Sequence, residues 1–79
     1  MTLTLKILSP EREVLSTGAD SVELPGSLGR FEILRNHAPL ISSLDAGTIR
    51  YAVGNEWHEI SCPGGFAEVR DNTVTVCIG

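Results

Sequence analysis

Four side chains of this sequence could bind a soft metal ion or take part in nucleophilic catalysis: His37, His58, Cys62 and Cys77. Their spacing matches neither Cys-x-x-Cys nor His-x-x-x-His, the arrangements that commonly bring two ligands to one zinc ion. We therefore expect no metal site. Two cysteines are also too few for the disulfide framework of a small secreted domain, and we expect no secretory leader. We expect both to be free, buried thiols in a reducing cytosol.

The glycine-rich patterns that bind phosphates are missing. The sequence contains neither G-x-x-x-x-G-K-[ST] nor a G-x-G-x-x-G that follows a strand and opens a helix. A Gly-x-Ser-x-Gly elbow is absent as well, and a chain of 79 residues rarely encloses the pocket that a substrate needs. We expect no cofactor and no catalysis. A small hydrolase, with a triad assembled in space around His37 or His58, is a less favoured alternative.

The histidines and the tryptophan each have a structural and a functional interpretation. His37 stands in an irregular turn before Pro39, and stabilisation of the turn and contact with a partner are equally supported. His58 is expected to be a partly buried structural residue. Trp57, the only tryptophan, is expected to pack in the core or at a sheet edge rather than to anchor a partner.

The charge balance excludes several classes of partner. The net charge is −4, and only six Lys or Arg residues are present, scattered along the chain. Binding to nucleic acid needs a basic face, so we expect none. Uninterrupted apolar stretches are two or three residues long, far too short for a transmembrane helix. No direct membrane insertion is expected, and a membrane-surface helix is disfavoured by the same lack of cations.

Glycine and proline punctuate the chain so often that no window suits an amphipathic helix. Between them, residues 2–7 alternate polar and apolar side chains, as do residues 21–24 more briefly, which is typical of half-buried strands. Several short strands at this spacing favour a sandwich or barrel. The sequence therefore predicts an all-β fold in a single domain of residues 1–79.

Two hairpins can be drawn with their register. A turn at Gly54–Asn55 tolerates positive φ and pairs Ile49 with Ile60, Arg50 with Glu59, Tyr51 with His58, and Ala52 with Trp57. One face of this hairpin then carries the apolar residues Ile49, Tyr51, Val53 and Ile60. A second turn at Asp71–Asn72 pairs Val69 with Val74 and Ala67 with Val76, which leaves Phe66 facing outward. Residues 25–39 are the least regular part, with a short strand over 31–33 between two turns.

The same segments resemble a known family. The resemblance to the epsilon subunit of F-type ATP synthases is carried by residues 5–10 (LKILSP), 24–33 (LPGSLGRFEI), 37–40 (HAPL), 44–50 (LDAGTIR), 63–69 (PGGFAEV) and 72–76 (NTVTV). It implies a flattened β-sandwich of about ten short, mostly antiparallel strands. It also implies a non-catalytic rotor subunit in the central stalk that binds the gamma subunit and the c-ring and couples proton-driven rotation to ATP synthesis.

Particular positions carry over from that resemblance. His37, Ala38, Pro39 and Ser42 match places where the family touches gamma, and Phe66 and Leu40 are candidates for exposed apolar contacts there. Arg30 falls at the c-ring contact, where family members often carry an acidic residue, so its charge is reversed relative to the family. Either the c-ring loop compensates for this reversal or that contact is lost. The resemblance further implies a monomer when isolated, peripheral at the cytoplasmic face of the bacterial inner membrane.

Other departures from the family are local or concern length. Residues 34–36 replace a more usual aromatic-Pro-Gly turn, Glu32 stands where glycine is common, and Pro63 replaces a usual serine. Most relatives continue into a pair of C-terminal helices that can inhibit ATP hydrolysis.

The alternative to the rotor subunit is a generic β-sandwich module that binds a protein or a carbohydrate. A carbohydrate module needs an aromatic platform, whereas the four aromatic residues here are dispersed.

Overall fold

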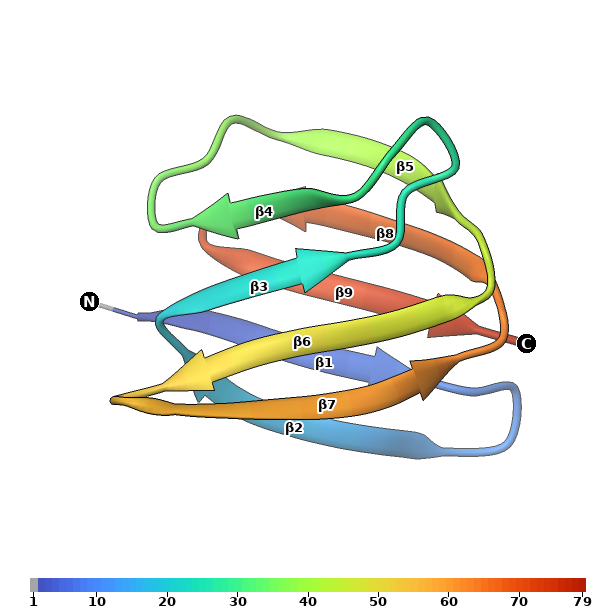
Figure 1. The fold of residues 1–79 in the computed structure, drawn as a ribbon, viewed down its shortest axis with the longest axis horizontal. Coiled ribbons are helices and arrows are strands. Elements are labelled where there is room, and N and C mark those ends of the chain that lie inside the picture. Colours follow the sequence, from blue (N-terminus) through green and yellow to red (C-terminus); the bar gives the residue numbers. More distant parts are fainter. Residues whose placement is uncertain (1) are drawn as a thin grey trace.

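The fold consists of nine β-strands in the computed structural model, which describes residues 2–79 and has no helix in that range (Figure 1). The strands are β1 (Leu3–Leu8), β2 (Glu13–Ala19), β3 (Ser21–Leu24), β4 (Phe31–Leu34), β5 (Leu40–Leu44), β6 (Gly47–Val53), β7 (Glu56–Cys62), β8 (Gly65–Arg70) and β9 (Thr73–Ile78). The prediction of an all-β fold is confirmed.

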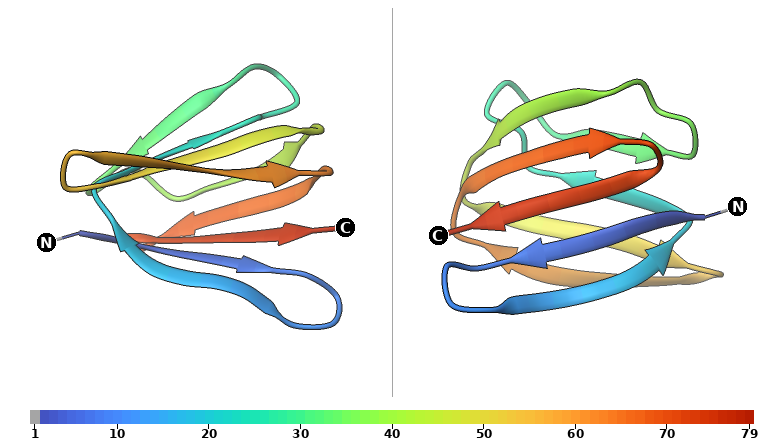
Figure 2. Two further views of the ribbon diagram at one scale, coloured as in Figure 1. Left: turned by 60° about the horizontal axis from the view of Figure 1, so that its bottom comes forward. Right: turned by 180° about the vertical axis from the view of Figure 1, so that it is seen from behind.

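These strands form two sheets that face each other (Figure 2). One sheet has five strands in the order β2-β1-β9-β8-β5, and the other has four in the order β4-β3-β6-β7. Every pair is antiparallel except β1 with β9. The fold therefore agrees with the expected sandwich of mostly antiparallel strands, with nine strands in place of about ten. An isolated bridge between Gly26 and Leu44 joins the β3–β4 connection to the edge strand β5.

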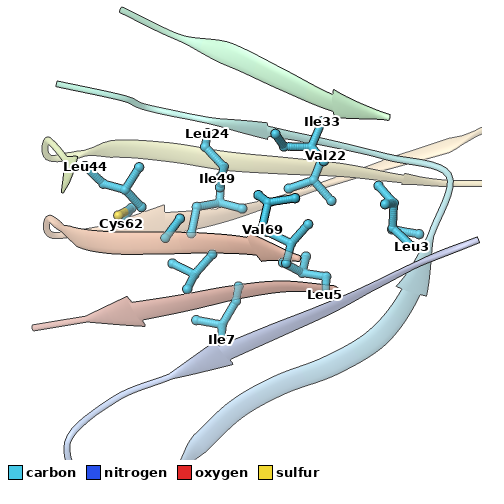
Figure 3. Close-up of a cluster of buried hydrophobic side chains, with 14 residues drawn as sticks. Leu3, Leu5, Ile7, Val22, Leu24, Ile33, Leu44, Ile49, Cys62 and Val69 are labelled. Carbon is cyan, nitrogen blue, oxygen red and sulfur yellow. The ribbon is translucent and has the colours of Figure 1, made fainter. Parts of the chain in front are cut away.

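Alternating side chains of both sheets fill the space between them (Figure 3). Leu3, Leu5 and Ile7 point inward from β1 and are fully buried, as the alternation of residues 2–7 predicts. The opposite sheet contributes Val22, Leu24, Ile33 and Ile49, all equally buried. Burying a side chain of this size contributes about 1.5–3 kcal/mol of hydrophobic stabilisation. Because these side chains occupy the inner face of each sheet, only the outer faces and the sheet edges are accessible to other molecules.

Both predicted hairpin registers are correct. The expected apolar face of the β6–β7 hairpin is wrong at one position, because Val53 is 43% exposed. Val53 is the last residue of β6, next to the Gly54–Asn55 turn, where the opposite sheet no longer covers it. Ala52 is buried instead, although it lies on the outer face, because its small side chain sits between its cross-strand neighbours Ser21 and Trp57.

The two cysteines are free in the structure and differ in burial. Cys62 ends β7 inside the core, as expected, whereas Cys77 is only partly buried. Val74 and Val76 occupy the inward positions of β9, so the alternation of a strand places Cys77 on the outer face. There it is the cross-strand partner of Phe66, which faces outward as predicted and is 50% exposed.

Candidate partner interface

The turn between β4 and β5 holds His37 by two local hydrogen bonds. Its backbone N–H donates to the Leu34 carbonyl at 3.2 Å, and its Nδ1 lies 2.7 Å from the Ala38 carbonyl oxygen. Because a carbonyl oxygen only accepts, Nδ1 carries a proton and donates in this bond, and Nε2 is the ring nitrogen that takes no part in it. His37 is half-buried, while Ala38 and Pro39 are exposed. The turn thus combines a self-stabilising bond with an accessible Ala-Pro segment.

Ser42 does not share a face with the exposed apolar residues of the same sheet. It pairs with Ala67, which is fully buried, so both side chains lie on the inner side of the five-stranded sheet. Ser42 remains half-buried at the edge strand β5, and its hydroxyl donates to the Ser43 carbonyl at 3.0 Å. The structure therefore places Ser42 close in sequence to the turn but on the opposite side of β5 from Ile41.

The outer face of the five-stranded sheet carries two exposed apolar side chains, of which Ile41 lies next to that turn and Phe66 lies farther along β8. Ile41 is 75% exposed and Phe66 is 50% exposed. We call this surface, with Leu8 and Cys77, the apolar face. One depression of about 360 Å³ adjoins Phe66 and is lined also by Leu8, Ser9, Pro10, Gly65, Cys77, Ile78 and Gly79. A second, of about 240 Å³, is lined by Pro39, Leu40, Ile41, Glu68, Val69 and Arg70 and connects the turn to this face.

The sequence identified only part of this face. Phe66 was expected there, but Leu40 pairs with the buried Val69 and is itself half-buried against the core. Ile41 takes the exposed position instead. Adjacent apolar residues at 40 and 41 leave the inward residue of β5 ambiguous, and only the register with β8 decides it.

Arg30 belongs to a group of charges on the outer face of the four-stranded sheet. Its Nε lies 3.4 Å from Glu23 Oε1, which also accepts a hydrogen bond from Arg50 at 3.1 Å. Arg50 forms a further ion pair with Glu59 at 3.3 Å, as the hairpin register predicts. The Arg30 side chain is still 40% exposed, so it combines a partner in β3 with an accessible guanidinium.

Trp57 and His58 lie on the edge strand β7 and are both exposed. Trp57 is 45% exposed, and the Arg50 guanidinium lies 4.5 Å from the centre of its ring, which is edge packing rather than core packing. His58 stacks on Tyr51 with ring centres 5.0 Å apart, but it is not partly buried as expected. Because β7 is an edge strand, a neighbouring strand covers its inward residues on one side only. This accounts for the exposure of His58.

Within residues 2–79, no three His, Cys, Asp or Glu side chains gather in a way that could hold a metal ion. The same residues contain no helix of the length and hydrophobicity needed to cross a membrane.

Comparison with known proteins assigns this sandwich to a family. The family model described as "ATP synthase, Delta/Epsilon chain, beta-sandwich domain" matches residues 2–78. The ATP synthase epsilon chain of Desulfitobacterium hafniense is 52% identical over 75 residues, covering 95% of this chain and 57% of the relative. The epsilon chain of Synechococcus elongatus is 45% identical over 78 residues, which covers 99% of this chain and 57% of the relative. The chloroplastic epsilon chain of Gracilaria tenuistipitata is 40% identical, covering 99% and 58%.

Solved structures show the same fold at low sequence identity. A chain of the Euglena gracilis mitochondrial ATP synthase superposes with a TM-score of 0.90 at 19% identity, covering 98% of this chain and 50% of that one. A chain of the Tetrahymena thermophila central stalk and c-ring gives 0.80 at 16% identity, covering 99% and 63%.

The class defined by fold and sequence is the β-sandwich domain of an ATP synthase subunit. The chain belongs to the ATP synthase delta/epsilon chain family. It spans somewhat more than half the length of the curated relatives that it matches.

Proposed function

We propose that this chain serves as the sandwich part of an epsilon-type subunit, a non-catalytic component of the central stalk of an F-type ATP synthase. In this role it binds the gamma subunit and the c-ring and couples proton-driven rotation to ATP synthesis at sites in other subunits. Membership of the family supports the role. The bacterial origin of the 52%-identical relative supports a peripheral position at the cytoplasmic face of a bacterial inner membrane.

The apolar face and the His37 turn are the proposed gamma contact. The observation that carries this assignment is the continuity of the two, because Pro39 of the turn lines the same depression as Ile41. Exposed apolar residues beside polar ones are typical of the centre and rim of a protein interface. A specific interface of this kind buries on the order of 1,000 Å² or more in total. His37, Ala38 and Pro39 form its rim, with Ser42 reached only at the edge of β5.

Arg30 is the proposed c-ring contact. Leu28, in the same β3–β4 connection, is fully exposed, so this connection presents an apolar tip next to a cation. Because Arg30 reverses the charge that the resemblance implies at this position, we propose that the c-ring loop that meets it carries compensating negative charge. The ion pair of Arg30 with Glu23 lowers the cost of holding the guanidinium in that position.

The positions of the aromatic residues and of His37 argue against the alternatives. Trp57 and Phe66 lie on the outer faces of different sheets, and Phe31 and Tyr51 pack against the core, so these four side chains build no carbohydrate platform. The ring of His37 bonds a backbone carbonyl rather than the carboxylate or hydroxyl of a catalytic triad.

Calorimetric titration of the chain into the gamma subunit of the same organism tests the proposal. We expect binding at micromolar or tighter affinity, weakened by His37→Ala at unchanged stability. His58→Ala is the matched control, since it removes an exposed histidine from the other sheet and is expected to leave affinity unchanged. A folded chain that does not bind gamma would contradict the proposed function. Equal losses of stability and affinity in His37→Ala would make His37 a structural residue.

A further inference from the structure

Two asparagines with left-handed backbone conformation meet where the two sheets approach each other. Asn36, with φ of 65°, lies in the turn after β4, and Asn72, with φ of 60°, lies in the β8–β9 turn. The Asn36 backbone N–H donates to Asn72 Oδ1 at 2.6 Å. In return, Asn72 Nδ2 donates a longer bond of 3.4 Å to Asn36 Oδ1. We call this contact the Asn36–Asn72 pair.

Asn72 is the fixed member of the pair. Its own carbonyl accepts the Thr4 N–H at 2.8 Å, which ties its turn to β1. The flanking strands are anchored by Val69 and Val74, which pair with each other and are buried in the core. The turn that carries Asn72 is therefore attached to the three central strands of the five-stranded sheet, β1, β9 and β8.

The turn that carries His37 gains its position from this fixed member. The two hydrogen bonds of His37 go to Leu34 and Ala38, so they shape the turn but do not place it relative to the opposite sheet. The bonds of the Asn36–Asn72 pair do so before the chain enters β5, because they join the turn to the β8–β9 turn of the five-stranded sheet. They act immediately before His37, at the start of the proposed rim of the gamma contact.

Backbone conformation alone does not require asparagine at these two turns. Glycine adopts positive φ at no steric cost, and asparagine tolerates it less well but better than most residues. Either residue therefore satisfies the two turns. The Asn72 side chain takes part in both bonds, whereas Asn36 contributes its backbone N–H to the shorter one and its side chain to the longer one.

We propose that Asn72 is a positioning residue of the gamma contact, holding the turn of His37, Ala38 and Pro39 in the geometry in which the partner binds it. This inference rests on the proposed function. A loop ordered before binding avoids part of the ordering cost that a mobile loop incurs on association. Loss of the pair is therefore expected to weaken gamma affinity roughly three- to tenfold while leaving the fold intact.

Three variants separate the side-chain bond from the backbone geometry. Asn72→Gly keeps the left-handed turn and removes both bonds. Asn72→Asp keeps the oxygen that accepts the Asn36 N–H and is the conservative rescue. Asn36→Gly is the matched control, because it retains the backbone N–H and the 2.6 Å bond and loses only the longer one.

The variants are compared by amide hydrogen exchange, urea unfolding and calorimetric titration into gamma. Asn72→Gly is expected to raise the exchange rate at Asn36 about tenfold or more, to lower the urea midpoint by about 1 M or less, and to reduce gamma affinity. Asn72→Asp and Asn36→Gly are expected to bind within about twofold of the unchanged chain. If the unchanged chain binds gamma and Asn72→Gly binds equally well, the inference is overturned while the proposed function stands. If the unchanged folded chain does not bind gamma, the proposed function itself fails.

Discussion

Replacing Gly65 by alanine tests how closely β8 and β9 approach at the end of the apolar face. Gly65 has a φ of +148°, and a Cβ built there would lie 1.9 Å from the Cys77 carbonyl oxygen. Relieving this overlap requires moving the β9 backbone away from β8, at the point where Phe66 pairs with Cys77. Gly29→Ala is the matched control, because Gly29 has a φ of +129° with nothing within 4 Å of the added Cβ.

The expected losses of stability distinguish backbone strain, which both variants have, from the steric overlap with Cys77, which only Gly65→Ala has. An L-residue in a sparsely populated backbone region costs about 1–3 kcal/mol, and both variants incur this. Gly65→Ala additionally loses ladder hydrogen bonds worth about 1 kcal/mol each and disturbs the packing beside them. We expect its free energy of unfolding to fall by about 3–5 kcal/mol, against about 1–2 kcal/mol for Gly29→Ala. A chain of this size is stabilised by roughly 4–12 kcal/mol, so Gly65→Ala removes a large share.

Urea unfolding followed by Trp57 fluorescence measures both variants. With a slope of about 1 kcal/mol/M, the midpoint of Gly29→Ala is expected to drop by about 1–2 M. That of Gly65→Ala is expected to drop by about 3 M or more, or the variant is largely unfolded without urea. Equal midpoints for the two variants would refute the reasoning, since the close approach to Cys77 would then cost nothing.

The remaining predictions concern the core and the charge group. Ile49→Ala empties a fully buried position and is expected to lower the free energy of unfolding by about 2–5 kcal/mol; a loss below 1 kcal/mol in urea would contradict the burial. Glu23→Gln weakens the contacts to Arg30 and Arg50 and is expected to cost about 1 kcal/mol or less; this loss should shrink in high salt, and an effect that ignores salt would speak against ion pairing. Arg50→Ala removes the cation above Trp57 and is expected to change the tryptophan emission with a stability loss of about 1 kcal/mol; an unchanged spectrum would count against that contact.

Local turn chemistry explains why so much of the fold could be predicted from the sequence. Gly54–Asn55 and Asp71–Asn72 are two-residue turns, and such a turn fixes the pairing of every residue in the strands that it joins. The structure accordingly has Arg50 opposite Glu59 and Val69 opposite Val74. The alternation of residues 2–7 likewise predicted which side chains of β1 enter the core.

Contacts between distant segments could not be predicted in the same way. The pairing of β1 with β9, the approach of Glu23 to Arg30 and Arg50, and the Asn36–Asn72 pair all depend on how the hairpins assemble. No local signal encodes them. In β5, the sequence Leu40–Ile41 suits either face of a strand, and the prediction that Leu40 is exposed was wrong for this reason. Of the candidate interface, the turn at His37 and the outward Phe66 were therefore accessible to sequence reasoning, and Ile41 was not.

The parallel pairing of β1 with β9 has a consequence for how the protein is made. Thr4 pairs with Thr73, so β1 can pair with β9 only after the last of the nine strands has been synthesised. Until then the five-stranded sheet exists at most as two fragments, β2-β1 and β8-β5, each with an open edge that can pair with another chain. Such distant pairing also slows folding, because the long intervening chain must be closed first. Completion of the sheet thus requires that β9 has been synthesised, and a nascent chain stalled before β9 presents unpaired strands for chaperones to shield.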